Sequence, residues 1–236
     1  MIGWLRAGYQ KTALTRGVFS LPVLNRTTSA ALAFVVLLAF LAPPMDQLAK
    51  AQSATAAAVA KPVSLPDIAI GSPKAPVTIT EYASMSCPHC AAFGENVFPM
   101  LRSKYVDTGK VRFVFREFPL DIKAAAASML VRCIGKDDAE KHFAVIEMLF
   151  KQQARLMDQT KETLFLVGKL NGMSEQEVET CEKDQALLDK IAADQRYAME
   201  ALKVDATPTF FVNGERWKGA MSYEELDAKL NTLLKR

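Results

Sequence analysis

The sequence predicts an α/β protein in which a small mixed β-sheet is interrupted by a helical insertion. Three observations predict this fold class. Alternating apolar and polar residues indicate strands both early and late in the chain. About 80 residues between these strand regions show only the helical spacing of apolar residues. A Cys-x-x-Cys tetrapeptide, Cys87-Pro88-His89-Cys90, directly follows the first strand. The chain has 236 residues, half of them hydrophobic, which is enough for such a core.

Residues 1–51 are predicted to be a signal peptide or a membrane anchor. The apolar run Ala30–Ala42 follows a basic stretch and is shorter than the roughly 20 residues that span a bilayer. This length favours a cleaved signal peptide, with Ala49-Lys50-Ala51 as a candidate cleavage site. Either alternative predicts a domain that faces an export compartment, where disulfides persist. Residues 52–63 are rich in small residues and are predicted to be an extended linker.

The formal net charge of +3 belongs to the N-terminal segment. Residues 1–51 contain five basic residues and one acidic residue, so residues 52–236 carry 24 basic and 25 acidic residues. The chain has no basic stripe and no interleaving of aromatic and basic residues. These features exclude a nucleic-acid-binding surface.

The first half of the predicted sheet has the order strand, helix, strand. Val77–Ala83 alternates apolar and polar residues and indicates a strand. Pro88 suits the first turn of a helix that we expect to continue to about Asp107. A second strand begins at Val111 and ends at Pro119. Two strands joined through a helix imply a parallel pair with a right-handed crossover.

The helical insertion and a C-terminal hairpin complete the pattern. Thr209–Val212 and Glu215–Lys218 indicate two strands joined by Asn213-Gly214, a strong hairpin signal. Ser222 and Glu225 predict a capped final helix, and Ser174 with Glu177 predicts a capping box inside the insertion. The predicted helices of the insertion are Ala124–Ile134, Ala139–Gln153, Lys161–Leu170, Ser174–Glu182 and Ala186–Leu202.

This order of elements is that of a thioredoxin fold with a helical insertion. Three stretches, Gly71–Ile79, Cys87–Cys90 and Thr207–Gly214, resemble the DsbA-like thiol:disulfide interchange proteins, bacterial periplasmic oxidants of exported proteins. We expect residues 64–120 and 203–236 to form the thioredoxin domain and residues 121–202 to form the insertion. The expected function is therefore a protein dithiol oxidase that introduces disulfide bonds through Cys87 and Cys90.

The position of the tetrapeptide assigns roles to its residues. At the N-terminus of a helix, the sulfur of Cys87 meets unpaired N–H groups and the positive end of the helix dipole, which favour the thiolate. His89 is expected to strengthen this effect, and Cys90, one turn inside the helix, is expected to be the resolving thiol. A lowered pKa of Cys87 stabilises the reduced dithiol form relative to the disulfide. Each unit by which this pKa is lowered raises the redox potential of the Cys87–Cys90 pair by about 30 mV.

The resemblance implies further site residues and partners. Pro208 matches a cis proline that faces the active site in the family, and Thr207 before it tunes the redox potential. Glu81 matches a buried acid that helps to move the proton of the resolving thiol, although a solvated strand residue is an equal alternative. The implied partners are unfolded exported proteins with cysteine pairs and a quinone-linked, DsbB-like membrane reoxidase. The expected protein is a periplasmic monomer that needs no metal or organic cofactor.

The remaining cysteines, Cys133 and Cys181, resemble the extra pair of one DsbA branch. In an exported chain they are expected to form a disulfide, and the loop of about 48 residues makes it worth about 4 kcal/mol. Two buried free thiols are the alternative, and the pair could also have a regulatory role.

Two other functions remain alternatives: a disulfide isomerase or reductase of the same fold, and a non-catalytic tethered binding or chaperone module. A purely structural disulfide between Cys87 and Cys90 is a further alternative. A zinc site lacks a second Cys-x-x-Cys or a His-x-x-x-His.

Overall fold

Five strands form one mixed sheet in the order β1-β3-β2-β4-β5 within the described part of the chain. The structure is a computed structural model that describes residues 45–61 and 63–235, with the backbone alone for residues 45–49, 51 and 52. The apolar run predicted at Ala30–Ala42 lies outside the described residues. Among the described helices, none has both the length and the apolar character needed to cross a bilayer.

The central strands confirm the predicted pairing. Strand β2 (Val77–Ala83) runs parallel to β3 (Val111–Glu117) and antiparallel to β4 (Thr209–Val212). Strand β5 (Glu215–Lys218) pairs antiparallel with β4 through the predicted hairpin. Its turn residues Asn213 and Gly214 both have positive φ, 47° and 84°, which explains the Asn-Gly pair. The loop that leads to Cys87 therefore leaves the carboxyl end of a central strand.

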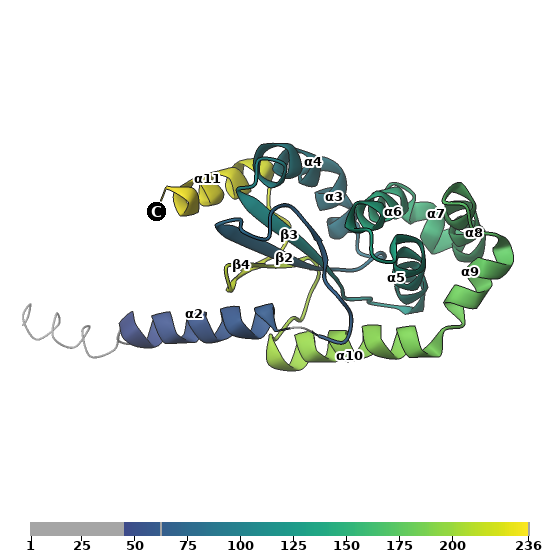
Figure 1. Cartoon of the computed structure of the whole chain (residues 1–236), viewed down its shortest axis with the longest axis horizontal. Coiled ribbons are helices and arrows are strands. Elements are labelled where there is room, and N and C mark those ends of the chain that lie inside the picture. Colours follow the sequence, from purple (N-terminus) through teal and green to yellow (C-terminus); the bar gives the residue numbers. More distant parts are fainter. Residues whose placement is uncertain (1–44, 62, 236) are drawn as a thin grey trace, which may run out of the picture. The chain divides into compact units, whose positions relative to one another are not determined.

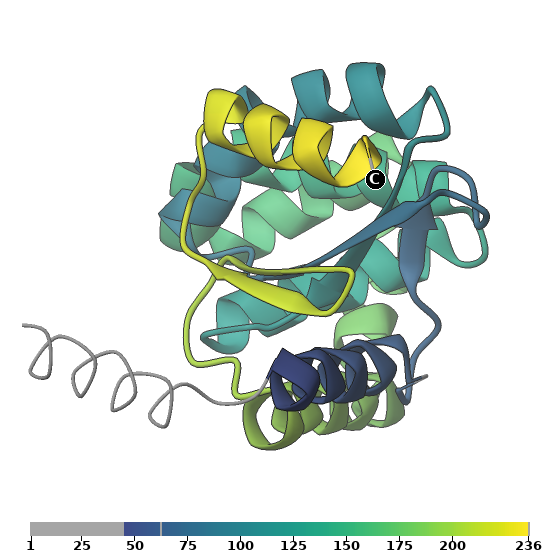
Figure 2. The ribbon, with the colours of Figure 1, turned by 90° about the vertical axis from the view of Figure 1, so that its left-hand side faces the viewer.

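Helices cover both faces of this sheet (Figures 1 and 2). Helices α3 (Pro88–Asn96), α4 (Phe98–Leu101) and α11 (Tyr223–Leu234) lie on one face, with the π-helical turn η1 (Arg102–Val106). We predicted one helix from Pro88 to about Asp107, but the helix breaks at Val97. Pro99 has no N–H to donate to a preceding carbonyl, so it sits at the start of a new helix.

Six helices lie between β3 and β4, where the sequence predicted the insertion. They are α5 (Ile122–Gly135), α6 (Ala139–Lys151), α7 (Gln153–Asp158), α8 (Thr160–Leu170), α9 (Glu175–Glu182) and α10 (Gln185–Ala201). Both predicted capping boxes are confirmed, at Ser174 and at Ser222. The predicted helix Ala139–Gln153 is divided at Gln152, which separates α6 from α7.

The predicted extended linker is wrong for most of its length. Helix α2 (Met45–Ala60) includes residues 52–60, because alanine has the highest intrinsic helix propensity. Val59 packs with Tyr82 and Phe211 of the sheet, and the hydroxyl of Tyr197 on α10 donates to the Ala58 carbonyl at 2.9 Å. Figure 1 shows the C-terminal end of α2 next to the C-terminal end of α10. Tertiary contacts thus add to the intrinsic helix propensity of this segment in stabilising α2.

A short strand and an ion pair attach the following segment to the sheet and the insertion. Strand β1 (Ile68–Ile70), which the sequence does not predict, pairs antiparallel with β3. Arg132 of α5 donates from two guanidinium nitrogens to the Glu117 carboxylate of β3 and from a third to the Pro66 carbonyl. Such a bidentate pair has a defined geometry. It connects the insertion to the central sheet.

Candidate active site

Cys87 lies where β2 gives way to α3. It is the N-cap residue of α3, with extended backbone angles, and Pro88 follows at the first helical position. Its carbonyl accepts hydrogen bonds from the N–H groups of Cys90 and Ala91, both at 3.1 Å. Only 5% of Cys87 is exposed, whereas Pro88 and His89 are exposed. The nucleophile predicted from the sequence is therefore at a helix N-terminus, as expected.

Hydrogen bonds to the sulfur of Cys87 stabilise its ionised form. The Cys90 thiol contributes most, followed by Thr207 and by the backbone N–H groups of Cys90 and His89. Together they lower the pKa of Cys87 from 9.0 to about 5, although burial acts in the opposite direction. The contribution of His89 here comes from its backbone, and the role expected for its imidazole stays a prediction.

Thr207 and Pro208 face Cys87 from the loop before β4. The Thr207–Pro208 peptide bond is cis, as the resemblance implied. The Cys87 thiol donates to the Thr207 carbonyl at a distance of 3.2 Å between sulfur and oxygen. With Cys87 in its thiol form, the Thr207 hydroxyl is buried and has no hydrogen-bond partner among the described residues, so it is available to the Cys87 thiolate. The loop thus places a carbonyl and a hydroxyl beside the reactive sulfur.

Cys90 is fully buried and differs sharply from Cys87. Burial raises the pKa of Cys90 far above its ordinary value, and the hydrogen bond to Cys87 and the charge of Glu81 act in the same direction. Since the thiolate is the attacking species, Cys90 cannot compete with Cys87 as nucleophile. The two cysteines therefore have the unequal reactivities that a nucleophile and a resolving thiol require.

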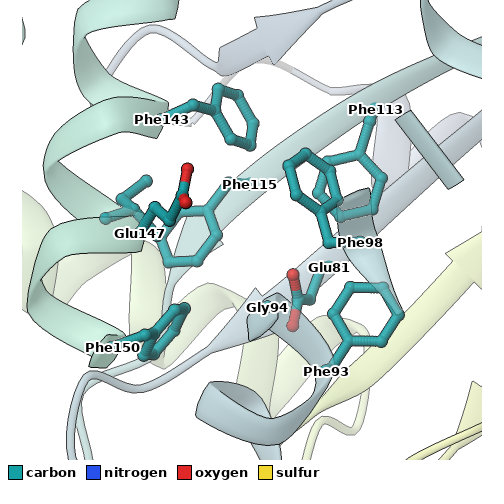
Figure 3. Close-up of a pocket in the computed structure, with 10 residues that line it drawn as sticks. Glu81, Phe93, Gly94, Phe98, Phe113, Phe115, Phe143, Glu147 and Phe150 are labelled. Carbon is teal, nitrogen blue, oxygen red and sulfur yellow. The ribbon is translucent and has the colours of Figure 1, made fainter. Parts of the chain in front are cut away.

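Glu81 is buried and interacts electrostatically with Cys87 and Cys90, which removes the alternative of a solvated strand residue. It lies on β2 with 3% exposure, and burial, followed by the charge of Cys87, raises the pKa of Glu81 to about 8. Its Oε1 atom has no hydrogen-bond partner in the described structure. Figure 3 shows this carboxyl beside a pocket lined by phenylalanines, with a cavity of about 20 Å³, room for about one water molecule.

Cys133 and Cys181 are joined by a disulfide between α5 and α9, with a Cα–Cα distance of 6.3 Å. Cys181 packs in a small apolar cluster with Met129 and Ile191. Because both sulfurs are in this bond, they are not free to bind a metal with Cys87 and Cys90.

Gln153, which the sequence does not predict as a site residue, contacts the loop before α3 directly. The Gln153 amide nitrogen donates to the carbonyls of Met85 and Cys87, at 2.8 and 3.0 Å. No sequence signal identifies this residue, because glutamine is common on helices and it is 66 positions from Cys87 along the chain. Only the tertiary structure brings it to the site.

Comparisons with known proteins agree with this arrangement. Residues 64–232 match the family described as thioredoxin. The crystal structure of Wolbachia pipientis α-DsbA1 has a TM-score of 0.66 and 32% identity, and the match covers 73% of this chain and 94% of that one. A relative from Rickettsia bellii, named a protein-disulfide oxidoreductase, is 33% identical over 150 residues, 63% of this chain and 57% of that relative. BdbD from Bacillus subtilis shares the fold, with a TM-score of 0.64, 22% identity and 72% and 94% of the two chains covered.

The fold and the unequal cysteine pair define a thioredoxin-fold protein of the thiol–disulfide exchange class, with a helical insertion. The chain belongs to the thioredoxin family and, within it, to the DsbA-like proteins. It spans little more than half the length of the Rickettsia relatives that it matches.

Proposed function

We propose that this chain is a protein dithiol oxidase that introduces disulfide bonds into exported proteins. The observation that carries the proposal is the stabilised thiolate of Cys87, which has a pKa of about 5. A group that stabilises the reduced pair makes the disulfide form a stronger acceptor of electrons. A weakly basic thiolate is also a good leaving group, so the substrate's disulfide is released readily.

The reaction proceeds through a mixed disulfide. A substrate thiolate attacks Sγ of Cys87 in the oxidised pair, the Cys87–Cys90 bond breaks, and Cys90 leaves with the electron pair. The second substrate thiolate then attacks the substrate sulfur of the mixed disulfide and releases Cys87 as a thiolate. Two electrons have moved from the substrate to the cysteine pair. A quinone-linked, DsbB-like membrane partner would remove them, and the protein would act as a monomer in the periplasm.

Refolding of ribonuclease tests the direction of electron flow. The oxidised protein is expected to restore activity to reduced ribonuclease at a stoichiometric amount of enzyme disulfide. Recovery from scrambled ribonuclease alone would instead assign the chain to the isomerases. A redox potential as reducing as that of thioredoxin, measured by equilibration with glutathione, would assign the chain to the reductases.

Glu81 is proposed to donate a proton to Cys90 when Cys90 leaves, and to accept that proton when Cys90 attacks in the reverse step. A carboxyl with a pKa of about 8 and a free oxygen is suited to exchange a proton near neutral pH. We expect Glu81→Gln to slow the attack of Cys90 on a mixed disulfide at Cys87 by about tenfold or more. The rate of the unaltered protein is expected to rise with pH up to about 8, and that of the variant to lose this rise.

Stopped-flow decay of a mixed disulfide with a small thiol measures this step. Glu147→Gln is a matched control, because Glu147 lines the same pocket but is exposed and pairs with Lys151 (Figure 3). Its pH profile is expected to be unchanged. An unaltered profile in Glu81→Gln would refute the proton-transfer role.

The pH dependence of stability is a second consequence of the Cys87 pKa. A pKa lowered by folding adds stability to the reduced protein, and this addition is complete above about pH 9. It decreases as the pH falls towards about 5 and is absent below that value. The oxidised protein has no such thiolate. We therefore expect the free energy of unfolding of the reduced form, relative to the oxidised form, to fall by about 1 kcal/mol per pH unit over this range.

Urea unfolding of both forms across this range measures the difference. Burial of Glu81 raises its pKa and has the opposite sign, since its stabilising effect is lost as the pH rises towards about 8. The contribution of Glu81 burial is the same in the reduced and the oxidised protein. It therefore cancels when the two free energies of unfolding are subtracted. A difference that does not vary with pH would contradict the stabilised thiolate.

A further inference from the structure

The helical insertion contacts the backbone of the nucleophile through the side chain of Gln153. The nitrogen Nε2 donates both of its hydrogens, one to the Met85 carbonyl at 2.8 Å and one to the Cys87 carbonyl at 3.0 Å. Both acceptors are carbonyl oxygens, so only the NH₂ end of the amide can face them. The side chain of Gln153 is half-buried, which reduces the competition from water.

A break in the helical insertion lies next to this contact. Helix α6 ends at Lys151, and Gln152 has φ −107° and ψ 16° before α7 begins at Gln153. The preceding turn is packed closely on the cysteine helix, because a Cβ atom on Gly94 of α3 would lie 2.9 Å from the Phe150 ring of α6. The end of α6 is thus packed against α3. Gln153 comes three residues after Phe150, and its side chain therefore reaches the loop before α3.

The contact acts on the carbonyl of the nucleophile itself. The Cys87 carbonyl accepts from three donors, the N–H groups of Cys90 and Ala91 and the Gln153 amide. The first of these belongs to the same turn whose N–H groups stabilise the Cys87 sulfur. Because the two hydrogen bonds hold the backbone at Met85 and Cys87 in place, the N–H groups of this turn stay oriented towards the Cys87 sulfur. The positive hydrogens of the amide also offset the negative end of the Cys87 carbonyl dipole.

We propose that Gln153 is a positioning residue whose amide fixes the backbone of Met85 and Cys87, and thereby makes the Cys87–Cys90 disulfide more oxidising. Gln153 does not touch a substrate atom in this role. It acts through the loop that presents the sulfur. The insertion therefore contributes to the redox properties of the site.

The other groups that act on Cys87 come from three segments. Cys90 and His89 lie on α3, Glu81 lies on β2, and Thr207 lies in the loop before β4. None of them is bonded to Gln153. A change at Gln153 thus alters the loop without removing a titratable group. The proposal rests on the exchange chemistry proposed for Cys87, but its test reads ionisation and redox equilibrium, not the oxidation of a client protein.

The test compares Gln153→Met with Gln152→Met in the full chain. Methionine has nearly the shape of glutamine and no donor, so the variant removes the two hydrogen bonds with little change in packing. Gln152 is adjacent, equally half-buried, and its side chain makes no hydrogen bond in the described residues, which makes it a matched control. Thiolate absorbance in the ultraviolet gives the pKa of Cys87. Equilibration with glutathione gives the redox equilibrium constant.

Gln153→Met is expected to raise the pKa of Cys87 by about one unit. The equilibrium constant at pH 7 is expected to shift about tenfold in favour of the disulfide, about 30 mV. Gln152→Met is expected to change neither quantity. Gln153→Lys keeps a donor and adds a positive charge, so it is expected to restore a low pKa.

A purely structural role has a different signature. If Gln153→Met lowers the free energy of urea unfolding but leaves the pKa and the equilibrium constant unchanged, the proposal is wrong. An equal shift in Gln152→Met would also overturn it, because the effect would then not depend on the amide. If the unaltered protein is as reducing as thioredoxin, the oxidase assignment fails, and the shift caused by Gln153→Met still tests the positioning role by itself.

Discussion

Replacement of Cys87 by alanine is expected to reduce the oxidation of reduced ribonuclease to the uncatalysed rate. The sequence has four cysteines, and two of them, Cys133 and Cys181, are joined to each other. Cys90 is then the only remaining free thiol, and it is fully buried with a strongly raised pKa. With a pKa of about 5, Cys87 is almost entirely thiolate at pH 7, whereas an ordinary thiol is mostly protonated. No other residue can replace it.

Replacement of Cys90 by alanine is the matched comparison. This variant keeps the nucleophile but lacks the resolving thiol, so mixed disulfides between Cys87 and client proteins are expected to accumulate. Non-reducing electrophoresis followed by reduction detects them. If Cys87→Ala retains full biological activity and Cys90→Ala captures no client, the chain is a non-catalytic binding module and the oxidase proposal fails.

Removal of the second disulfide is expected to cost about 4 kcal/mol of stability. The bond closes a loop of 48 residues, so its loss enlarges the conformational freedom of the unfolded chain. It also joins α5 to α9 inside the insertion, where Cys181 packs in an apolar cluster. The double variant Cys133→Ala/Cys181→Ala avoids leaving a single free thiol that could exchange with Cys87. Urea unfolding of the oxidised double variant and of the oxidised unaltered protein measures the difference.

The dependence of the unfolding free energy on urea separates an effect on the unfolded chain from a loss of packing in the folded insertion. A change that acts through the unfolded chain is expected to raise the m-value, because the unlinked chain exposes more surface on unfolding. The Cys87 pKa is expected to stay near 5, since the cysteines of the second disulfide are not among the groups that act on it. A loss of less than about 1 kcal/mol would show that the insertion is held by its other contacts, including the Arg132–Glu117 pair.

The fold was largely predictable, because its signals are local. The alternation in β2 and β3, the Asn213-Gly214 turn and the capping boxes at Ser174 and Ser222 each depend on neighbouring residues. The errors also have physical reasons. The helix after Cys87 breaks before Pro99, and the alanine-rich segment of α2 forms a helix where an extended linker was expected. Strand β1 has only three residues and owes its existence to pairing with β3.

The sequence by itself determined the chemistry: two cysteines at the start of a helix, a proline that could face them, and a second pair far along the chain. The ionisation of Cys87 depends on groups from separate segments, since Thr207 lies 120 positions away from it along the chain. Gln153, which donates to the Cys87 carbonyl, lies 66 positions away. Burial of Glu81 is likewise a property of the packed sheet and helices. Hydrogen bonds and desolvation act over a few ångströms in space, whatever the separation along the chain, so only the tertiary structure could place these groups around the sulfur.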